Sequence, residues 1–493
     1  MEFVFSLIAI LWIIRIILNT LTYAQLWWVK EYRWDRMIIH LRTAQGKRIL
    51  WPAWHRPRIS PKSTLLVIMS LIASGYIFVT LDFHISLRLA IVDLVSFPLS
   101  WIVVFILNAP TMVYHKIVIA RAISMLRKHK SMQVIGITGS YGKTSTKEYL
   151  ATILASKFQV LKTEASKNSP IGIAEVILKS LKPKHEVFVV EMGAYKRKEI
   201  KEMAAMVRPQ IGIITAINEQ HQDLFGTMEN TMKAKYELIE GLEGKRIAIM
   251  NIDNARVRTM AEWATRDGRE VWGVTKEISK SKYQIANKYK KTYSAIDITA
   301  SFDGVEFTCA SEKEQFQVKV PVLGAHQASN LLAAIAGAMA AGMTMAEAVK
   351  GANKITLNPK SLSMIPGING SISINDTFNN SPDSARAALD VLAWGKAKKI
   401  LVFQPMIELG AFAKESHISI GSYAARICDE VILTNQNFYD DFMKGVRSQS
   451  ESLRVEVLSA QKARARLRMI LSARDAVLFK GKEAGNVLQA MKI

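Results

Sequence analysis

Three long apolar stretches lie in the first part of the chain. Met1–Leu21 contains two charged residues, and neither Ser63–Leu81 nor Leu94–Tyr114 contains any. Each stretch is about 20 residues long, the length of an α-helix that crosses the hydrocarbon core of a bilayer. The first stretch lacks the basic start and the small-residue cleavage site of a signal peptide. The pattern therefore predicts a membrane region at residues 1–130 with about three transmembrane helices.

The loops around these stretches differ in charge. The loop between the first two stretches is rich in Lys and Arg, whereas Asp82–Asp93 contains only Arg88, and basic residues return after the third stretch. Lys and Arg concentrate in cytoplasmic loops, so the basic loop and the rest of the chain are predicted to lie in the cytoplasm. This charge pattern predicts a multi-pass protein of the cell (inner) membrane.

A run of aromatic and basic residues follows the first stretch. It consists of Trp27, Trp28, Lys30, Tyr32, Arg33 and Trp34. Such a run is typical of a segment at the membrane interface on anionic lipid. The net charge of +23, from 65 Lys and Arg against 42 Asp and Glu, also suits an anionic partner. Because the run adjoins a predicted span, lipid is the expected partner and nucleic acid is not.

The pattern changes at Ser131 to short apolar runs that alternate with amphipathic stretches, which is typical of an α/β domain. Gln133–Thr138 is a predicted strand, and a helix is expected soon after the glycine-containing segment GSYGKTS at residues 139–145. Glycines let backbone N–H groups approach a phosphate, Lys143 can reach the outer phosphates, and Thr144 can hold Mg²⁺. The segment therefore predicts a nucleotide site, although Ile137 occupies the place of the first glycine in the strict phosphate-loop spacing.

Two further predicted strands run into polar residues. Val187–Val190 is followed by Glu191, and Ile211–Ile217 leads to His221. The carboxyl ends of the strands in an open α/β sheet meet at the ligand crevice. We therefore expect both residues near the phosphate loop, as magnesium ligands or as groups that orient catalytic residues. A single residue of this kind is more often an ordinary strand-end residue, but the joint arrangement favours a site.

These segments resemble the motifs of the Mur ligase family of peptidoglycan synthesis. They are most similar to the MurF type, which adds D-alanyl-D-alanine to a UDP-muramoyl tripeptide. The similarity extends from about Val134 to Lys492 and keeps the family's order of motifs. The matching segments are TGSYGKTSTKE at 138–148, NSPIG at 168–172, EMG at 191–193, HQDLFGT at 221–227, AK at 234–235, GAHQASN at 324–330, NDTFNNSP at 375–382 and MIELG at 406–410.

The resemblance implies the architecture and the chemistry. After the membrane region we expect a central ATP-binding Mur ligase domain at residues 131–325 and a C-terminal, Rossmann-like Mur ligase domain at residues 326–493, both α/β. The implied activity is ATP-dependent amide-bond formation through an acyl phosphate, in cell wall biogenesis and the maintenance of cell shape. The implied cofactors are ATP and Mg²⁺, and the implied partners are a muramoyl peptide, or a related carboxylate, and the amine D-alanyl-D-alanine.

The resemblance also assigns roles to individual residues. The implied catalytic residues are Lys143, His221, Lys235 and Asn330. The implied nucleotide contacts are Gly139, Ser140, Gly142, Lys143, Thr144, Ser145, His326, Asn330, Lys360 and Asp376. The implied metal ligands are Thr144, Glu191, His221 and a carbamylated Lys235, and the implied substrate contacts are Asn168, Asn379 and Glu408.

The sequence departs from the family pattern at four places. Lys360 follows Pro359 where the family usually has an arginine on the terminal phosphate, and lysine lacks the bidentate fork of arginine. Lys198 stands in place of a glycine before Glu199, and Lys482 in place of a late serine. The membrane region stands where the family has its UDP-sugar domain. A lipid-linked acceptor, or a partner subunit that supplies substrate recognition, is therefore an alternative to a soluble UDP-linked acceptor.

Two other functions fit the same residues. One is a membrane-anchored ligase of the same chemistry for another or lipid-linked polymer, such as a polyglutamate synthetase, because a fold does not fix its substrate. The other is a non-catalytic ATP-binding scaffold, which fits the absent arginine. A Mur-like amidase subunit with a four-cysteine zinc ribbon is disfavoured because Cys309 and Cys428 are the only cysteines. The presence of Lys143, Glu191, His221 and Lys235 favours an enzyme.

Overall fold

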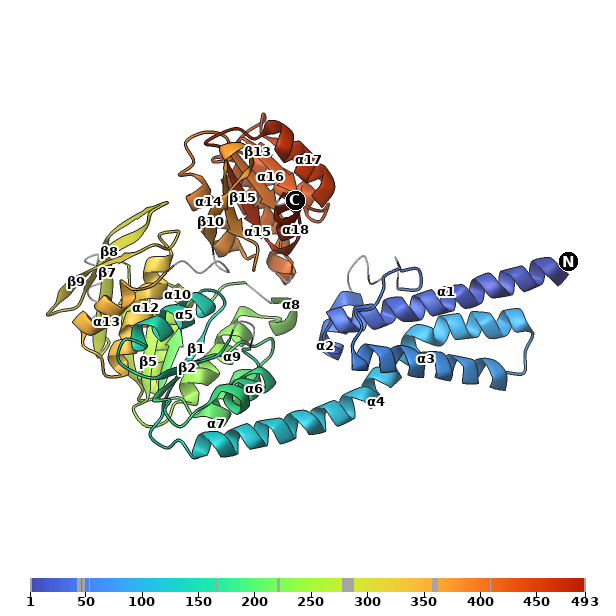
Figure 1. Cartoon of the computed structure of the whole chain (residues 1–493), viewed down its shortest axis with the longest axis horizontal. Helices are drawn as coiled ribbons and strands as arrows, with labels where there is room; N and C mark the ends of the chain where they lie inside the picture. Colours follow the sequence, from blue (N-terminus) through green and yellow to red (C-terminus); the bar gives the residue numbers. More distant parts are fainter. Residues whose placement is uncertain are drawn as a thin grey trace. The chain divides into compact units, whose positions relative to one another are not determined.

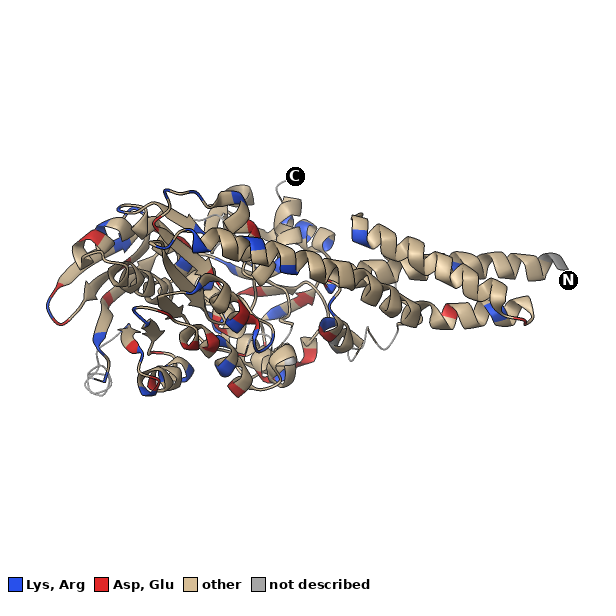
Figure 2. Ribbon diagram, turned by 90° about the horizontal axis from the view of Figure 1, so that it is seen from below, with Lys and Arg blue, Asp and Glu red and all other residues tan. Residues whose placement is uncertain are grey.

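The chain forms two compact units, Met1–Ala120 and Arg121–Ile493 (Figure 1). The computed structural model describes residues 2–41, 46, 49–52, 54–164, 167–219, 222–276, 288–356, 362–407 and 409–491. Charged side chains are sparse on the long helices of the first unit and frequent on the α/β part of the second (Figure 2). The two units therefore differ in composition as the hydrophobic pattern predicts.

The first unit is helical. Its helices are α1 (Glu2–Val29), α2 (Trp34–Leu41), α3 (Pro61–Thr80) and α4 (Ile85–Arg127). Within the described residues, the segments Val4–Val29, Pro61–Thr80 and Ile85–Arg127 are long and apolar enough to cross a membrane. They coincide with the three predicted spans. The helix of the third span, α4, is longer than the predicted apolar stretch. It has 43 residues in all and contains Pro98 and Pro110.

An ion pair joins the first and last of these helices. Nε of Arg15 on α1 donates to Oδ2 of Asp93 on α4 at 2.8 Å. Trp12 and Asn19 donate to the same carboxylate at 3.3 and 3.1 Å. An unpaired charge at the centre of a transmembrane helix costs about 3 kcal/mol or more. Mutual pairing therefore offsets the cost of these two charged residues within mainly apolar parts of α1 and α4.

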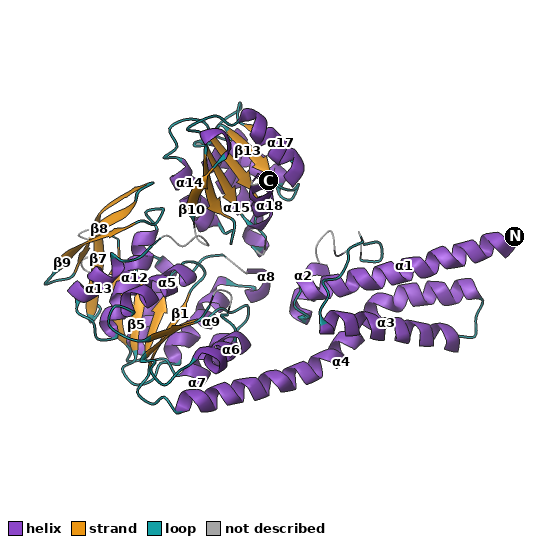
Figure 3. Ribbon diagram, in the orientation of Figure 1, coloured by secondary structure: helices purple, strands orange, loops and turns teal. Residues whose placement is uncertain are grey.

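The larger sheet of the second unit has nine strands in the order β2-β3-β1-β4-β5-β6-β7-β8-β9. Strands are orange and helices purple in Figure 3. The strands of the larger sheet are β1 (Gln133–Thr138), β2 (Val160–Lys162), β3 (Val187–Glu191), β4 (Ile211–Ile214), β5 (Ile247–Asn251), β6 (Glu270–Thr275), β7 (Lys291–Ser301), β8 (Gly304–Ala310) and β9 (Gln315–Val320). The pairs from β2 to β7 are parallel, and β7-β8 and β8-β9 are antiparallel. Every residue of β3, β4 and β5 is buried, as in parallel strands covered on both faces.

Helices cover this sheet. They are α5 (Lys143–Leu154), α6 (Pro170–Ser180), α7 (Glu199–Val207), α8 (Gln222–Phe225), α9 (Met228–Glu240), α10 (Ala255–Arg266), α12 (Gln327–Ala340) and α13 (Met345–Ala352). α12 is almost wholly buried, and residues such as Leu331 and Ile335 share a core with the strands. The helix that follows residue 325 thus packs on the larger sheet, while the domain boundaries at 130 and 325 remain predictions.

The smaller sheet has six strands in the order β10-β11-β15-β12-β13-β14. Its strands are β10 (Ser363–Pro366), β11 (Ile372–Asp376), β12 (Lys399–Phe403), β13 (Glu430–Leu433), β14 (Arg454–Val457) and β15 (Ala476–Lys480). Its helices are η2 (Ile368–Gly370), α14 (Pro382–Leu392), η3 (Gly410–Phe412), α15 (Ala413–Ala425), α16 (Tyr439–Arg447), α17 (Ala460–Ile470) and α18 (Lys482–Met491). All strand pairs except β10-β11 are parallel. The predicted α/β fold class is confirmed.

Candidate active site

The phosphate loop connects β1 to the first turn of α5. Its two glycines have positive φ, +152° at Gly139 and +80° at Gly142, where residues with a Cβ are strained. A Cβ on Gly142 would also lie 2.4 Å from Oδ1 of Asn330, so a larger residue does not fit. The chain therefore turns tightly into α5, whose N-terminal N–H groups suit a bound phosphate.

Lys143 is the first residue of α5, and its side chain folds back over the loop. Nζ donates to the backbone oxygens of Gly139 at 2.8 Å and Ser140 at 3.0 Å. Burial lowers the pKa of Lys143, and the charge of Glu191 partly opposes this shift. Ser140 is fixed because its Oγ accepts from the backbone N–H of Asn218 at 3.1 Å. Lys143 thus lies where it can contact a phosphate held by the loop.

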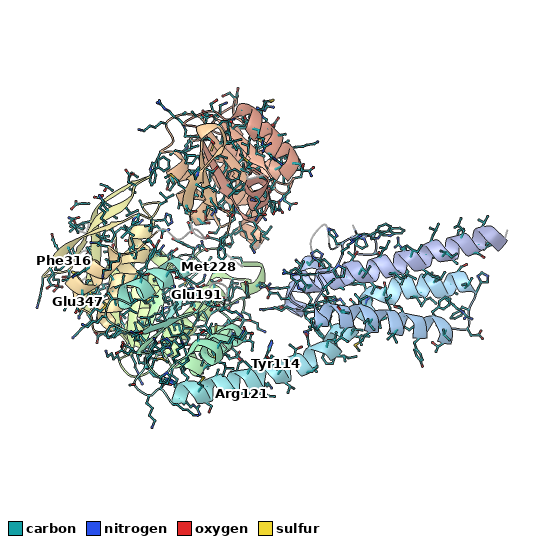
Figure 4. The ribbon with its side chains drawn as sticks, viewed as in Figure 1. Tyr114, Arg121, Glu191, Met228, Phe316 and Glu347 are labelled. Carbon is teal, nitrogen blue, oxygen red and sulfur yellow. The ribbon has the colours of Figure 1, made fainter. Side chains whose placement is uncertain are left out.

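Glu191 ends β3 of the larger sheet (Figure 4). Its carboxylate has several polar partners. The hydroxyl of Thr144 donates to Oε2 and the amide of Asn168 to Oε1, both at 3.0 Å. Nζ of Lys147, whose side chain is 0% exposed, lies 3.5 Å from Oε2. The backbone N–H of Glu191 donates to Oγ1 of Thr163 at 2.9 Å. A buried charge needs hydrogen bonds and an opposite charge to offset the loss of water. These partners supply both to the Glu191 carboxylate beside the phosphate loop.

The oxygens at this point of the site suit Mg²⁺. The hydroxyl of Thr144 and the carboxylate of Glu191 are hard donors in direct contact with each other. Mg²⁺ usually binds one or two carboxylates together with substrate phosphates, rather than a cage made only of protein groups. Among the described residues, no three His, Cys, Asp or Glu side chains gather as a metal site of their own. The donor set therefore fits a magnesium ion that is shared with a nucleotide phosphate.

Lys235 lies on α9, and its side chain is buried near the same groups. Burial lowers the pKa of Lys235 to about 7, and the charge of Lys143 adds to the shift. The carboxylates of Glu199, Glu237 and Glu191 oppose it, in that order. A substantial share of the Lys235 amine is therefore neutral near pH 7, and only the neutral amine is nucleophilic.

The start of α12 brings polar side chains to the phosphate loop. Nδ2 of Asn330 donates to Oε1 of Gln327 at 3.0 Å, and its Oδ1 accepts from Thr146 at 3.4 Å. Tyr149 donates to the same Gln327 oxygen at 3.1 Å. Burial, and then the charge of nearby lysines, lowers the pKa of His326 to about 4, so its imidazole is neutral at pH 7. α12 is thus tied to α5 through its first turn.

A second polar group lies at the carboxyl ends of the strands of the smaller sheet. Nζ of Lys480, which is almost completely buried, donates to Oδ2 of Asp376 at 2.5 Å and to the backbone oxygen of Asn379 at 3.0 Å. Buried His417 accepts at Nε2 from the backbone N–H of Met406 at 2.9 Å. Lys480 therefore fixes the segment after β11, and His417 fixes the segment after β12.

Two known domain families match the chain over these elements. The Mur ligase middle domain matches residues 137–338, and the glutamate ligase domain of Mur ligases matches residues 362–483. The chain belongs to the Mur ligase family. The phosphate loop of this Mur ligase lies in the first matched region, and the Asp376–Lys480 pair lies in the second.

Two curated relatives are each named UDP-N-acetylmuramoyl-tripeptide--D-alanyl-D-alanine ligase. The relative from Escherichia coli (strain K12) is 31% identical over 300 residues, which are 61% of this chain and 63% of the relative. The relative from Bacillus subtilis (strain 168) is 30% identical over 292 residues, which are 59% of this chain and 60% of the relative. The Mur ligase described here thus matches less than two thirds of the length of these relatives.

Solved structures have the same fold. Crystal structure I of MurF from Acinetobacter baumannii has a TM-score of 0.68 at 23% identity and covers 76% of this chain and 80% of that chain. MurF from Thermotoga maritima, solved in complex with ADP, has a TM-score of 0.66 at 23% identity and covers 77% of this chain and 83% of that chain. Both confirm the expected Mur ligase fold.

The predicted site residues of this Mur ligase fall into three groups. The larger sheet and its helices bring together Gly139, Ser140, Gly142, Lys143, Thr144, Asn168, Glu191, Lys235 and Asn330. Ser145 lies in the first turn of α5, His326 precedes α12, and Asp376 and Asn379 surround Lys480. His221, Lys360 and Glu408 lie outside the described residues. The roles of all the predicted site residues remain predictions.

Sequence reasoning missed the partners that hold these groups. Lys147 lies 3.2 Å from Glu148 and 3.5 Å from Glu191, and the motif TGSYGKTSTKE contained it without a role. Lys480 was visible as one charged residue that ends the apolar run AVLF. No sequence pattern marks Glu237, because its carboxylate accepts hydrogen bonds from backbone N–H groups of a segment that is distant in sequence.

Proposed function

We propose that this chain is a membrane-anchored, ATP-dependent ligase of the MurF type, which adds D-alanyl-D-alanine to a muramoyl peptide in peptidoglycan precursor synthesis. The observation that carries the proposal is the phosphate loop at the start of α5, with Thr144 bonded to Glu191 and Lys143 folded over the loop. The names of the E. coli and B. subtilis relatives supply the substrate class. ATP and Mg²⁺ are the cofactors that these residues fit.

The first step transfers a phosphoryl group. An oxygen of the acceptor carboxylate attacks the γ-phosphorus of ATP, the bond from that phosphorus to the bridging oxygen breaks, and ADP leaves an acyl phosphate behind. The loop N–H groups and Lys143 would hold the phosphates, while Thr144 and Glu191 would hold the metal. Mg²⁺ bound there would neutralise charge on the phosphates. Positioning and charge stabilisation therefore provide most of the rate enhancement.

The second step forms the amide. The amine nitrogen of D-alanyl-D-alanine attacks the acyl carbon, the carbon–oxygen bond to phosphate breaks, and the nitrogen loses a proton. Phosphate departs with one of the original carboxylate oxygens. Because water would hydrolyse the acyl phosphate, the reaction needs a site from which water is excluded.

The remaining residues receive roles from the family resemblance. Asn330 and His326 would contact the nucleotide from the start of α12, with Lys360 near the terminal phosphate, and Asp376 would lie near the ribose. The proposed substrate contacts are Asn168, Asn379 and Glu408. The bond from Asn168 to Glu191 supports a position of Asn168 next to the phosphate loop.

Lys235 is proposed to carry a carbamate. Its neutral amine would attack CO₂, a nitrogen–carbon bond would form, and one proton would be released. The resulting carboxylate would hold a metal ion together with His221. The burial of Lys235 and its pKa of about 7 support this reaction, because they leave neutral amine available at physiological pH.

The proposed location is the inner membrane, with several spans and with the catalytic domains in the cytoplasm. The three apolar helices support this location. The ring of Trp101 lies 5.0 Å from that of the buried Trp27 and 5.8 Å from that of Trp34, so these aromatic residues pack against one another within the helical unit. Anionic lipid is the proposed contact of the basic residues near them. The location fits an acceptor linked to UDP or to a lipid, and also a partner subunit that helps to bind the acceptor.

Phosphate release by the purified full-length protein tests the proposal. ATP and Mg²⁺ are supplied, and UDP-muramoyl tripeptide and D-alanyl-D-alanine are added singly and together, beside a Lys143→Ala control. We expect release that requires both substrates and is lost in the control. Release that is independent of either substrate, or no release by a protein that binds ATP, would contradict the proposed activity.

A further inference from the structure

Three consecutive basic residues, Lys196, Arg197 and Lys198, form a loop between β3 and α7; we call this segment the cationic loop. All three side chains are exposed. None forms an ion pair with another residue in the part of the chain that the structure describes. The charge of Arg197 acts at longer range on Glu229 and Glu240 of α9, and Glu229 is already paired with Lys233. The cationic loop therefore presents unneutralised positive charge.

Two glutamates hold the backbone of the cationic loop. Oε2 of Glu199 accepts from the backbone N–H of Tyr195 at 2.7 Å and of Lys196 at 3.3 Å. The carboxylate of Glu237, which is 4% exposed, accepts from the backbone N–H of Lys198 at 2.7 Å and of Lys201 at 3.0 Å. The two carboxylates thus accept hydrogen bonds from the backbone of the loop and do not pair with its basic side chains. A loop fixed in this way loses little entropy when it binds a ligand.

The backbone at Lys198 is strained. Its φ of +77° lies in the left-handed region, which costs free energy for a residue with a Cβ. Glycine would remove this cost, and the family pattern has glycine here. The chain therefore keeps a lysine side chain at a position where the backbone alone favours glycine.

The cationic loop borders the proposed reaction site. It begins five residues after Glu191, the last residue of β3, and in the connecting segment the backbone N–H of Gly193 donates to the backbone oxygen of Asn168 at 2.8 Å. Glu199 and Glu237, which hold the cationic loop, are close enough to act electrostatically on Lys235. The cationic loop thus lies at the same carboxyl edge of the sheet as the phosphate loop, where ligands of α/β proteins bind.

We propose that the cationic loop binds the diphosphate that links the acceptor to its carrier. This inference rests on the proposed ligase function and adds to it the group by which the acceptor is held. Three adjacent cations match a multiply charged diphosphate better than a single carboxylate, and the guanidinium of Arg197 can bind phosphate oxygens in a bidentate manner. A nucleotide-linked and a polyprenyl-linked acceptor share this diphosphate.

Binding measurements on the full-length protein in detergent test the assignment. The ligands are UDP-muramoyl tripeptide, polyprenyl-diphosphate-linked muramoyl tripeptide, and muramoyl tripeptide without phosphate. The variant is Lys196→Ala/Arg197→Ala/Lys198→Ala. The matched control is Lys182→Ala/Lys184→Ala, two exposed lysines that precede β3 at the opposite end of the same strand.

We expect the triple variant to bind the diphosphate-linked acceptor at least about tenfold more weakly, since each bond to a charged group contributes about 1.5–3 kcal/mol. Its affinity for the phosphate-free tripeptide should change less than about twofold. The control should bind all ligands as the wild type does. The linked acceptor that the wild type binds, and that the triple variant binds more weakly, identifies the source of the diphosphate.

Lys198→Gly separates a binding role from a structural one. Glycine relieves the left-handed strain, so the melting temperature should hold or rise while the affinity for the diphosphate-linked acceptor falls. Equal losses for the linked and phosphate-free tripeptides, or the same loss in the control, would overturn the diphosphate assignment alone. A wild type that turns over neither linked acceptor and binds none of the three ligands would overturn the proposed substrate and the assignment together.

Discussion

The hydroxyl of Thr144 donates a 3.0 Å hydrogen bond to the carboxylate of Glu191, 47 residues further along the chain. This bond joins the first turn of α5 to the end of β3 and aligns two oxygen donors beside the phosphate loop. Lys147, buried under the same carboxylate, balances its charge. The Glu191 side chain thus links the proposed nucleotide and metal sites to the packing of β3 against α5.

Replacement of Glu191 by glutamine tests its role toward the metal. The amide keeps the size of the side chain and removes its charge, so we expect at least about a 100-fold loss of substrate-dependent phosphate release, comparable to the loss of one electrostatic stabiliser in other enzymes. The Mg²⁺ concentration for half-maximal nucleotide binding should rise. Glu175→Gln, at a partly exposed residue paired with Lys167, serves as the control. An unchanged Mg²⁺ dependence in Glu191→Gln would refute the assignment.

Lys147 should contribute mainly to stability. Lys147→Met leaves Glu191 buried without its cation, and removal of one partner from a buried ion pair costs about 3–5 kcal/mol. We expect a clear fall in the midpoint of thermal unfolding. In the double variant with Glu191→Gln the loss should be smaller than the sum of the two single losses, because the residues interact. Strictly additive losses would show that the two charges are not coupled.

Gly142 should tolerate no side chain. Gly142→Ala combines left-handed strain with a Cβ at 2.4 Å from Oδ1 of Asn330, so it should abolish nucleotide binding. Gly268→Ala is the matched control, because Gly268 also has positive φ but has open space around its Cβ position. That variant should lose only about 1 kcal/mol of stability and keep nucleotide binding. Equal nucleotide affinity in both variants would contradict the close approach of α12 to the loop.

The lowered pKa of Lys235 should make the free energy of unfolding depend on pH. Its pKa is about 7 in the folded protein and 10.5 in its unperturbed state, so between these values the unfolded chain binds more protons and stability rises with pH. Lys235→Met lacks this titration. In buffers free of bicarbonate, the melting temperature of the wild type relative to Lys235→Met should therefore increase from pH 7 to pH 10. A constant difference over this range would refute the lowered pKa.

Carbamylation of Lys235 has a direct spectroscopic test. Addition of ¹³C-bicarbonate to the wild type should produce a carbamate carbon resonance that Lys235→Met lacks. Lys233→Met, which changes an exposed lysine on the same helix, should retain the resonance. The same signal in the Lys235→Met variant would assign the modification to another amine.

The sequence was most informative where a site depends on neighbouring residues. The strand, the two glycines and Lys143 lie within a dozen residues, so the pattern at 133–145 was enough to predict the phosphate loop and its helix. Glu191 could be predicted because an apolar run ends in a single acid. The partners of Glu191 come from separate segments, and their contacts depend on how the sheet brings β1 and β3 side by side.

Other features were not visible in the pattern. The apolar stretch that ends at Tyr114 gives no sign that α4 continues to Arg127. Hydrophobicity marks the part of a helix that can lie in a membrane, but it does not mark where the helix ends. The pairing of Arg15 with Asp93 depends on how two helices pack. The left-handed backbone at Lys198 likewise goes with a hydrogen bond from its backbone N–H to Glu237, a partner far away in sequence.

The fate of an isotopic label tests the central claim most directly. The acceptor carboxylate of the muramoyl tripeptide is labelled with ¹⁸O, and the full-length protein is given ATP, Mg²⁺ and D-alanyl-D-alanine, with Lys143→Ala as background. If the carboxylate attacks the γ-phosphorus, the released phosphate carries one ¹⁸O atom from the acceptor. Phosphate without the label, in a reaction that consumes ATP, would contradict an acyl phosphate pathway.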